Sequence, residues 1–301
     1  MYKRLLLGSV LCLCLGGVQA GHLELEKVSE SVFLVLPATG DSTSQSNAAF
    51  VLLPDGILLF DTLSSAELLQ EMLELIAKVS DLPINRVVLS HFHPDHTGGL
   101  IALRERDLEL YVGPTTTESF NRARSTKFSL LQRMEQATEG MARQENDPER
   151  AAELRRQSQG HREKLRQIRL MPVLAPSVVV KDRLELKAGD RTLILLHNGP
   201  GHSEGDLMLY LPDDKILLSG DVLSVAMLPY MQDADSTAWL LRLGEIAALE
   251  VEAFVPGHGG LGDESDLAAF RKFLVTLRQM VEPIARRGTR MDLLEIGRAS
   301  L

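Results

Sequence analysis

The stretch Ser90–His96, which reads Ser90-His91-Phe92-His93-Pro94-Asp95-His96, packs three imidazoles and a carboxylate into six consecutive positions. A buried polar side chain without a partner costs free energy, so metal sites gather such groups at this density and packed cores do not. The run 86–89 before it (RVVL) reads as a buried strand, and 97–100 after it (TGGL) as the start of a helix. The candidate ligands therefore lie on a strand-to-helix loop, where α/β proteins place active sites.

Three further motifs downstream each follow a predicted strand and offer a His or Asp flanked by glycine. They are 198–206 (NGPGHSEGD), 218–221 (LSGD) and 255–259 (VPGHG). Glycine permits sharp turns and lets the backbone approach a bound group closely. Of the eight histidines in the chain, five fall in these motifs and the first stretch, which favours a metal site assembled from distant segments.

Taken in this order and at these spacings, the motifs resemble those of the metallo-β-lactamase superfamily of hydrolases, over roughly residues 31–286 apart from a helical insertion. The resemblance implies an α/β fold, the four-layer αβ/βα sandwich, with the site at one edge between two sheets. It also implies two zinc ions and the residues that hold them. One ion would bind His91, His93 and His202, the second would bind Asp95, His96 and His258, and Asp221 would bridge both.

Imidazole and carboxylate ligands suit zinc, and they suit iron or manganese as well. Two divalent ions held close together lower the pKa of a shared water, so that hydroxide exists near neutral pH. We expect this bridging hydroxide to cleave an ester, thioester, lactone or amide bond of a small molecule, with Asp95 also orienting it. A covalent enzyme intermediate is not expected, because no Ser lies in an evident nucleophile motif and both cysteines, Cys12 and Cys14, lie in the N-terminal leader.

Several antibiotic-degrading members place Cys or Ser where Asp221 stands, whereas a bridging Asp is typical of the thioesterase, lactonase, nuclease and phosphodiesterase branches. Three alternatives therefore stay open: β-lactam hydrolysis as a main or side activity, phosphodiester cleavage, and a non-catalytic metal-binding partner of a periplasmic oxidation system. The loop Val222–Ala234 gives a weaker resemblance to exported zinc metallohydrolases associated with quinoprotein relay or sulfur oxidation. Tyr230 in this loop is interpreted as a donor to a developing oxyanion or as a packing aromatic.

Other polar residues have plainer interpretations. Asp61 ends a predicted strand, where it either orients a ligand imidazole or caps the following helix. Asp206 is expected to hold its own loop together, and His197 to be packed rather than a ligand. The remaining two histidines, His22 and His161, are expected in solvent, and Trp239 in the core.

The N-terminus reads as a signal peptide over residues 1–20. Lys3 and Arg4 precede an apolar run, Leu5–Val18, and Val18-Gln19-Ala20 is a small-residue cleavage site. Cleavage would leave residues 21–301 as the hydrolase domain in the periplasm or outside the cell; a retained N-terminal anchor is the alternative. Apart from export, no membrane association is expected. The net charge of −9 argues against a general nucleic-acid partner.

Residues 118–170 interrupt the alternation of strands and helices. The segment reads as two or three helices and holds twelve Lys or Arg against eight Asp or Glu. We interpret it as a helical insertion: a solvated excursion, a lid over the site, or an arm that forms a homodimer. Within it, Asp147-Pro148 resembles a helix N-cap followed by proline at the first helical position. The segment 178–186 after it reads as one continuous strand.

Overall fold

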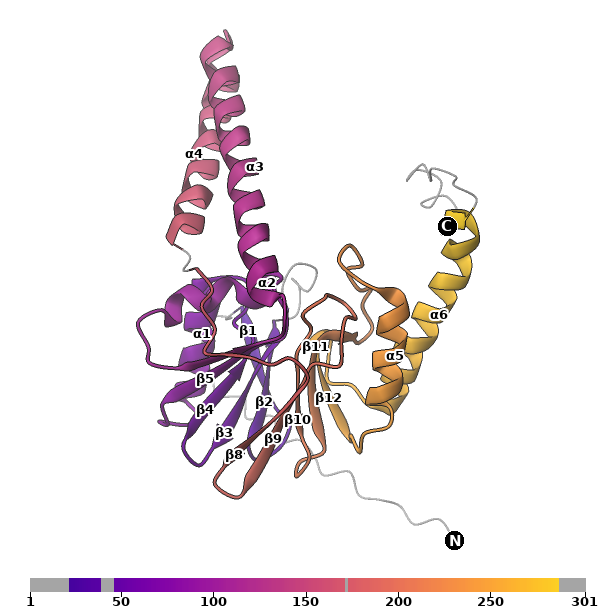
Figure 1. The fold of residues 1–301 in the computed structure, drawn as a ribbon. Coiled ribbons are helices and arrows are strands. Elements are labelled where there is room, and N and C mark those ends of the chain that lie inside the picture. The colour runs from indigo at the N-terminus through magenta and orange to yellow at the C-terminus, as the bar shows by residue number, and fades with distance from the viewer. Residues whose placement is uncertain (1–21, 39–45, 171–172, 287–301) are drawn as a thin grey trace.

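The computed structural model describes residues 22–38, 46–170 and 173–286. Two β-sheets pack face to face and carry helices on their outer sides (Figure 1). In sheet order, the first sheet consists of β1 (Leu23–Lys27), β2 (Val32–Pro37), β3 (Ala48–Leu53), β4 (Gly56–Phe60), β5 (Ile84–Leu89), β6 (Glu109–Val112) and β7 (Val178–Val179). The second consists of β12 (Ala253–His258), β11 (Ile216–Ser224), β10 (Met208–Leu211), β9 (Arg191–Leu196) and β8 (Arg183–Ala188).

The helices fall into three groups. On the first sheet lie α1 (Ala66–Ala77), the short α2 (Pro94–Thr97) and the 3₁₀-helix η1 (Gly98–Leu103). Two long helices, α3 (Thr116–Gln144) and α4 (Pro148–Leu170), form a hairpin that we call the arm. On the second sheet lie α5 (Ser236–Ile246) and α6 (Glu264–Arg286). Within the described residues, no helix has the length and apolar character needed to cross a membrane.

Each sheet changes from antiparallel to parallel pairing at the strands that lead to the histidine motifs. The hairpins β1 to β4 are antiparallel, whereas β4, β5, β6 and β7 run parallel. In the second sheet, β8 to β11 are antiparallel and β11 pairs in parallel with β12. Because β4 and β5 run parallel, their carboxyl ends lie at one edge of the first sheet. The packing of the two sheets brings the end of β12 to the same side, where His258 lies 3.2 Å from Asp95.

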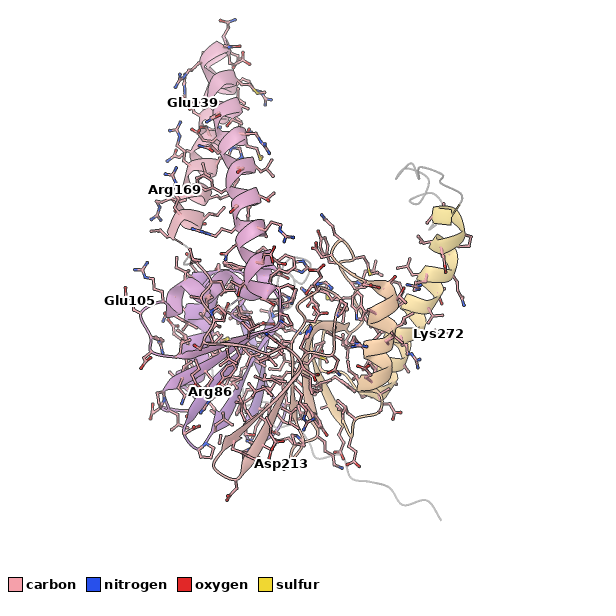
Figure 2. The ribbon with its side chains drawn as sticks, viewed as in Figure 1. Arg86, Glu105, Glu139, Arg169, Asp213 and Lys272 are labelled. Atoms are coloured by element: carbon pink, nitrogen blue, oxygen red, sulfur yellow. The ribbon has the colours of Figure 1, made fainter. Side chains whose placement is uncertain are left out.

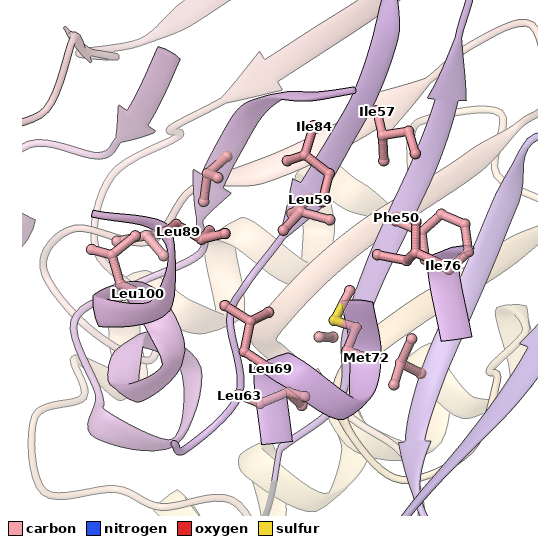
Figure 3. Close-up of a cluster of buried hydrophobic side chains, with 14 of the residues drawn as sticks. Phe50, Ile57, Leu59, Leu63, Leu69, Met72, Ile76, Ile84, Leu89 and Leu100 are labelled. Carbon is pink, nitrogen blue, oxygen red and sulfur yellow. The ribbon is translucent and has the colours of Figure 1, made fainter. Parts of the chain in front are cut away.

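Three apolar layers hold the sandwich together. Residues of α1 at three- and four-residue spacing, Leu69, Met72 and Ile76, are buried against the outer face of the first sheet (Figure 3). Ser65 begins this helix by accepting a hydrogen bond from the backbone of Leu68 at 3.2 Å. A middle layer joins the inner faces of the two sheets, and a third layer packs α5 and α6 on the second sheet. These layers confirm the predicted αβ/βα sandwich.

The arm formed by α3 and α4 rises away from the sandwich (Figure 1). Near its base, Leu131, Leu165 and Ile168 pack together with Phe128. Higher up, Ala142, Ala151 and Leu154 are also buried, and ion pairs add to the contact. Arg162 lies 2.7 Å from Glu135 and 2.8 Å from Glu139, and Figure 2 labels Glu139 on the upper arm. The predicted insertion is thus a two-helix hairpin.

The N-cap predicted within the insertion is also present, because Asp147 accepts a hydrogen bond from the backbone of Arg150 at 2.9 Å. A basic side chain supports the lower part of the hairpin, where Arg124 Nε donates to the carbonyl of Ile168 at 3.2 Å.

The prediction of one strand over 178–186 is wrong. Val178–Val179 belongs to the first sheet and Arg183–Ala188 to the second. The chain passes from the first sheet to the second between Val180 and Asp182. The backbone of Val180 still donates to the carbonyl of Val112 in the first sheet at 2.9 Å, whereas the carbonyl of Asp182 accepts from the backbone of His197 in the second sheet at 2.7 Å. Residue spacing did not reveal this crossing, because hydrogen bonds to strands of two different sheets decide it. The predicted signal peptide, residues 1–20, lies outside the described residues.

Candidate metal centre

Seven side chains from four segments converge at one edge of the sandwich. His91 and His93 follow β5, and Asp95 and His96 lie in α2, where Pro94 occupies the first helical position. The other three come from the second sheet: His202 from the loop between β9 and β10, Asp221 from β11, and His258 from the end of β12. Asp221 therefore lies inside a strand rather than after one, at irregularities in the β11–β12 register between Leu218 and Ser224.

The first group consists of His91, His93, His202 and Asp221, all buried, with one ligand atom from each within 4.8 Å of the others. His93 Nδ1 lies 2.8 Å from His91 Nε2 and 3.0 Å from His202 Nε2. Asp221 Oδ2 is 3.3 Å from His202 Nε2 and 3.8 Å from His91 Nε2. Three imidazole nitrogens and a carboxylate oxygen thus surround one point.

The second group, Asp95, His96 and His258, has its ligand atoms within the same 4.8 Å limit. Asp95 Oδ2 lies 3.2 Å from His258 Nε2 and 3.5 Å from His96 Nε2. Asp221 faces this group as well, with Oδ1 3.1 Å from His96 Nε2 and Oδ2 3.5 Å from His258 Nε2. The structure therefore brings all seven predicted residues together and places Asp221 between the two groups.

Hydrogen bonds behind the histidines determine which nitrogen carries the hydrogen. Ser90 Oγ donates to Asp61 Oδ2 at 2.7 Å, so it accepts from His91 Nδ1 at 2.9 Å. His96 Nδ1 donates to Asp61 Oδ2 at 2.8 Å, and His93 Nε2 donates to Asp233 Oδ2 at 2.9 Å. In each neutral ring the other nitrogen then points a lone pair into the site.

These inward lone pairs fit a cation. His91 Nε2 and His93 Nδ1 face each other at 2.8 Å, a repulsive arrangement for two lone pairs that a positive ion between them relieves. His96 Nε2 and Asp221 Oδ1 are buried and have no hydrogen-bond partner among the described residues. Buried polar atoms without a partner are costly, so these two atoms, which face each other at 3.1 Å, are suited to act as ligand atoms.

The contacts of Asp61 show that it orients a ligand imidazole and does not cap the following helix. It orients the His96 ring and accepts a hydrogen bond from the backbone of Ser90 at 2.7 Å, while Ser65 caps the following helix instead. Sequence reasoning missed Ser90 and Asp233 as partners of the ligand imidazoles. Asp233 lies in the loop between β11 and α5, but the nearby Asp235 caps α5, and residue type alone does not distinguish the two.

Two residues before β3 fasten the separate ligand segments to each other. Ser46 Oγ donates to the carbonyl of Asp95 at 2.6 Å. Asn47 Nδ2 donates to the carbonyls of Pro256 and Gly259 at 2.9 and 2.8 Å. The strand β3 thereby fixes the α2 segment against the segment that carries His258. No motif pointed to these residues.

Glycine at position 257 is required by close approach. A Cβ there would lie 1.9 Å from Asp221 Oδ1, far closer than a van der Waals contact between carbon and oxygen allows. Gly220 has φ of +52°, and a Cβ on it would meet the Ser90 side chain at 2.4 Å. The glycines of the downstream motifs therefore let two strands pack directly against the ligand carboxylate.

The electrostatics of the site show where protons bind when no ion is present. Burial lowers the pKa of His91 well below its ordinary value and that of His202 to about 4. Burial also opposes the charge of His96 and His258, but neighbouring carboxylates outweigh it: Asp221 and Asp61 raise the pKa of His96 well above its usual range, and hydrogen bonds with Asp221 and Asp95 raise that of His258 to about 9. Asp221 has a pKa well below its usual range, because the imidazoles outweigh its burial.

A cavity of about 420 Å³, here called the metal pocket, opens onto both groups. Its lining comprises Phe92, His93, Pro94, Asp95, Ala123, Asp221, Met227, Leu228, Pro229, Tyr230, Asp233 and His258. Tyr230 is half exposed, its ring meets His93 edge-on at 5.3 Å between centroids, and its hydroxyl donates to Gln232 Oε1. The loop after β11 and the base of α3 thus form the pocket's walls, mostly with apolar side chains.

The remaining predicted residues lie outside the ligand set. Asp206 accepts hydrogen bonds from the backbone and hydroxyl of Ser203 and holds its loop, and its burial raises its pKa to about 7. His197 is packed, with Nδ1 donating to the carbonyl of Asp206 at 2.8 Å. Trp239 is fully buried and His22 is exposed, as expected. His161 is partly buried, because it lies between the arm helices 3.5 Å from Thr138 Oγ1.

Comparison with known proteins places this geometry in a family. Residues 42–258 match the family described as the metallo-beta-lactamase superfamily. The acyl-coenzyme A thioesterase MBLAC2 of Bos taurus is 32% identical over 176 residues, which are 57% of this chain and 54% of that protein. The linear primary-alkylsulfatase of a Pseudomonas species is 25% identical over 218 residues, 68% of this chain and 40% of that protein. The chain thus spans about half, or less, of the length of these two relatives.

A solved metallo-beta-lactamase from Pontibacter korlensis has the same fold, with a TM-score of 0.60 at 21% sequence identity over 84% of this chain and 98% of that one. The chain belongs to the metallo-β-lactamase superfamily, because the family match covers most of its length and includes all seven candidate ligands. The names of these two relatives, an acyl-coenzyme A thioesterase and an alkylsulfatase, are those of hydrolases.

Proposed function

We propose that the protein is an exported hydrolase that uses two zinc ions to cleave an ester or thioester bond of a small molecule. The observation that carries the proposal is the set of imidazole lone pairs, fixed by Ser90, Asp61 and Asp233, that point at each other and at Asp221. His91, His93 and His202 would hold one ion, and Asp95, His96 and His258 the other, with Asp221 between them. Iron or manganese would suit the same ligands.

Bound divalent ions supply an activated water and a Lewis acid that polarises the substrate. The chain's own residues provide the rest. Burial raises the pKa of Asp95, but the hydrogen bond from His258 and the charge of His96 outweigh this effect and lower it. Asp95 is therefore ionised at neutral pH and lines the metal pocket as a proton acceptor and orienting group.

Tyr230 is the second proposed catalytic group. It lies at the wall of the metal pocket beside His93, where its hydroxyl could turn from Gln232 to a developing oxyanion. The apolar side chains around it, among them Met227 and Leu228, favour a substrate with an apolar portion. Ester or thioester cleavage is favoured by the thioesterase among the relatives.

The test is metal analysis of the purified chain together with hydrolysis of a panel: a p-nitrophenyl ester, an acyl thioester, a lactone, a chromogenic cephalosporin and a phosphodiester. We expect about two ions per chain, with ester or thioester cleaved fastest. In His93→Ala, both hydrolysis and metal content should fall, whereas in His22→Ala neither should change. A chain that binds no zinc, or that prefers the cephalosporin or phosphodiester, would overturn the proposal.

Export is proposed from the pattern of residues 1–20 alone. Fractionation of cells that produce the full chain, followed by mass determination of its N-terminus, tests it. Mature protein beginning at Gly21 in the periplasmic fraction is the expected result. An uncleaved chain in the membrane fraction would favour a retained anchor instead.

A further inference from the structure

A second cavity, of about 580 Å³, lies between the base of the arm and the segment formed by α1 and η1. Its apolar lining includes Ile101, Leu130, Leu131, Ile168 and Leu170. We call it the chain cavity. None of the seven candidate metal ligands lines it, so the metal centre does not account for it.

The chain cavity adjoins the metal pocket. Pro94 lines both, and α3 contributes successive turns of one face: Ala123 to the metal pocket, then Lys127 and Leu130 to the chain cavity. A molecule that leaves the metal pocket over Pro94 therefore meets the chain cavity next. In Figure 1 the base of α3 stands directly above α2, which begins at Pro94.

Apolar surface in the chain cavity is left uncovered by the described part of the chain. Leu131 and Ile168 are buried in the contact between the two arm helices, but their neighbours Leu130 and Leu170 remain 48% and 46% exposed. Large exposed apolar side chains around a concave surface mark a binding site for an apolar group.

The charges around the chain cavity are mainly positive. Lys127 and Lys164 line it, and neither has an ion pair among the residues that the structure describes, whereas Arg166 is neutralised by Glu163 at 2.7 Å. Among the described lining residues, Glu67 is the acidic one. Lysine stems cover apolar surface while their ammonium groups stay in water, where they attract an anion.

We propose that the chain cavity holds the hydrocarbon chain of the substrate, an anionic long-chain acyl compound whose cleavable bond lies in the metal pocket. This inference rests on the proposed function and narrows its substrate class. The hydrocarbon chain runs over Pro94 along α3, and the ammonium groups of Lys127 and Lys164 attract the anionic substrate toward this side of the molecule. Each methylene that leaves water for such a cavity strengthens binding about fourfold, so specificity follows chain length.

The first test compares p-nitrophenyl acetate with p-nitrophenyl dodecanoate on the metal-loaded chain. The ratio of kcat/KM for the long ester to that for the short ester should be well above one, and Leu130→Asp should lower this ratio about tenfold or more, because a carboxylate replaces apolar surface. Met141→Asp is the matched control: Met141 is also an exposed apolar residue on α3, but it does not line the chain cavity. An unchanged ratio in Leu130→Asp, or an equal fall in Met141→Asp, overturns the proposal.

The second test does not depend on hydrolysis. Calorimetric titration of the full chain with dodecanoate should show binding that weakens about tenfold in Lys127→Glu combined with Lys164→Glu. Binding should not weaken in Arg133→Glu, which changes an exposed residue of α3 that does not line the chain cavity. If neither ester is hydrolysed but dodecanoate binds in this pattern, the proposed function is wrong, whereas the proposal that the chain cavity binds a hydrocarbon chain is supported. If both esters are hydrolysed equally and dodecanoate does not bind, the chain cavity fails alone.

Discussion

At the residue scale, the candidate metal centre depends on carboxylates that are not candidate ligands but hydrogen-bond to the ligand imidazoles. Asp61 has φ of 63°, a left-handed conformation that Asp tolerates better than most residues, and from there it reaches both His96 and Ser90. Through Ser90 it also determines the tautomer of His91. One side chain at the end of β4 thus orients ligands for both groups.

Asp61→Asn should weaken metal binding roughly 10- to 100-fold, because the amide keeps the size of the side chain but can present its NH₂ group to His96. Competition with a chromogenic chelator measures the affinity. The control is Asp81→Asn, because Asp81 is exposed and its side chain makes no hydrogen bond or ion pair among the described residues. Equal affinities in both variants would mean that Asp61 has no orienting role.

At the element scale, the arm meets the sandwich near its base, where Phe120 packs in the apolar layer on the first sheet. The cluster of Phe128, Leu131, Leu165 and Ile168 lies low on the hairpin. The upper part is joined by a few small buried contacts, at Ala142, Ala151 and Leu154, and by ion pairs such as Arg162–Glu135. Exposed pairs contribute little to stability. The upper arm should therefore fold or unfold without affecting the two sheets.

Replacing the residues between Glu135 and Ser158 with a Gly-rich turn of about four residues tests this independence. The two side chains already approach each other, since Ser158 Oγ donates to Glu135 at 3.4 Å. The melting temperature of the sandwich should stay within about 3 °C of the intact chain in calorimetry. A large fall would show that the upper arm stabilises the core, and a change in mass by light scattering would identify it as a dimer contact.

At the scale of the whole molecule, metal binding and protonation compete for the same edge of the sandwich. Without an ion, His258 has a pKa of about 9 and that of His96 is also raised, so both hold protons at neutral pH. A ligand imidazole binds metal only after losing this proton. Binding of zinc should therefore release protons into solution.

The sign of the effect follows from these pKa shifts. As pH rises towards about 9, fewer protons compete and the apparent zinc affinity should increase; below neutral pH it should fall steadily. Calorimetric titration in two buffers of different ionisation enthalpy counts the protons released. The same zinc should raise the melting temperature more at pH 8 than at about pH 6, because a ligand that binds only the folded state stabilises it according to its affinity. A pH-independent affinity would contradict protonated ligands.

The sequence predicted much at the level of single elements. The period of α1, the Asp147 cap in the arm and the glycine-flanked motifs depend on neighbours within a few residues, so local chemistry was enough to find them. The crossing between β7 and β8 and the place of Asp221 inside β11 could not be predicted, because hydrogen bonds to other strands decide both.

By itself, the sequence determined the residue types and order of the seven candidate ligands, and with them the family. Only the tertiary structure decided which partners surround them: Asp233 on His93, Asn47 on the His258 segment, and the chain cavity beside Pro94. The reason is physical. A ligand motif consists of residues close together in the sequence, so it can be recognised there. The direction of a lone pair or the wall of a cavity depends on distant segments that meet only when the two sheets have packed.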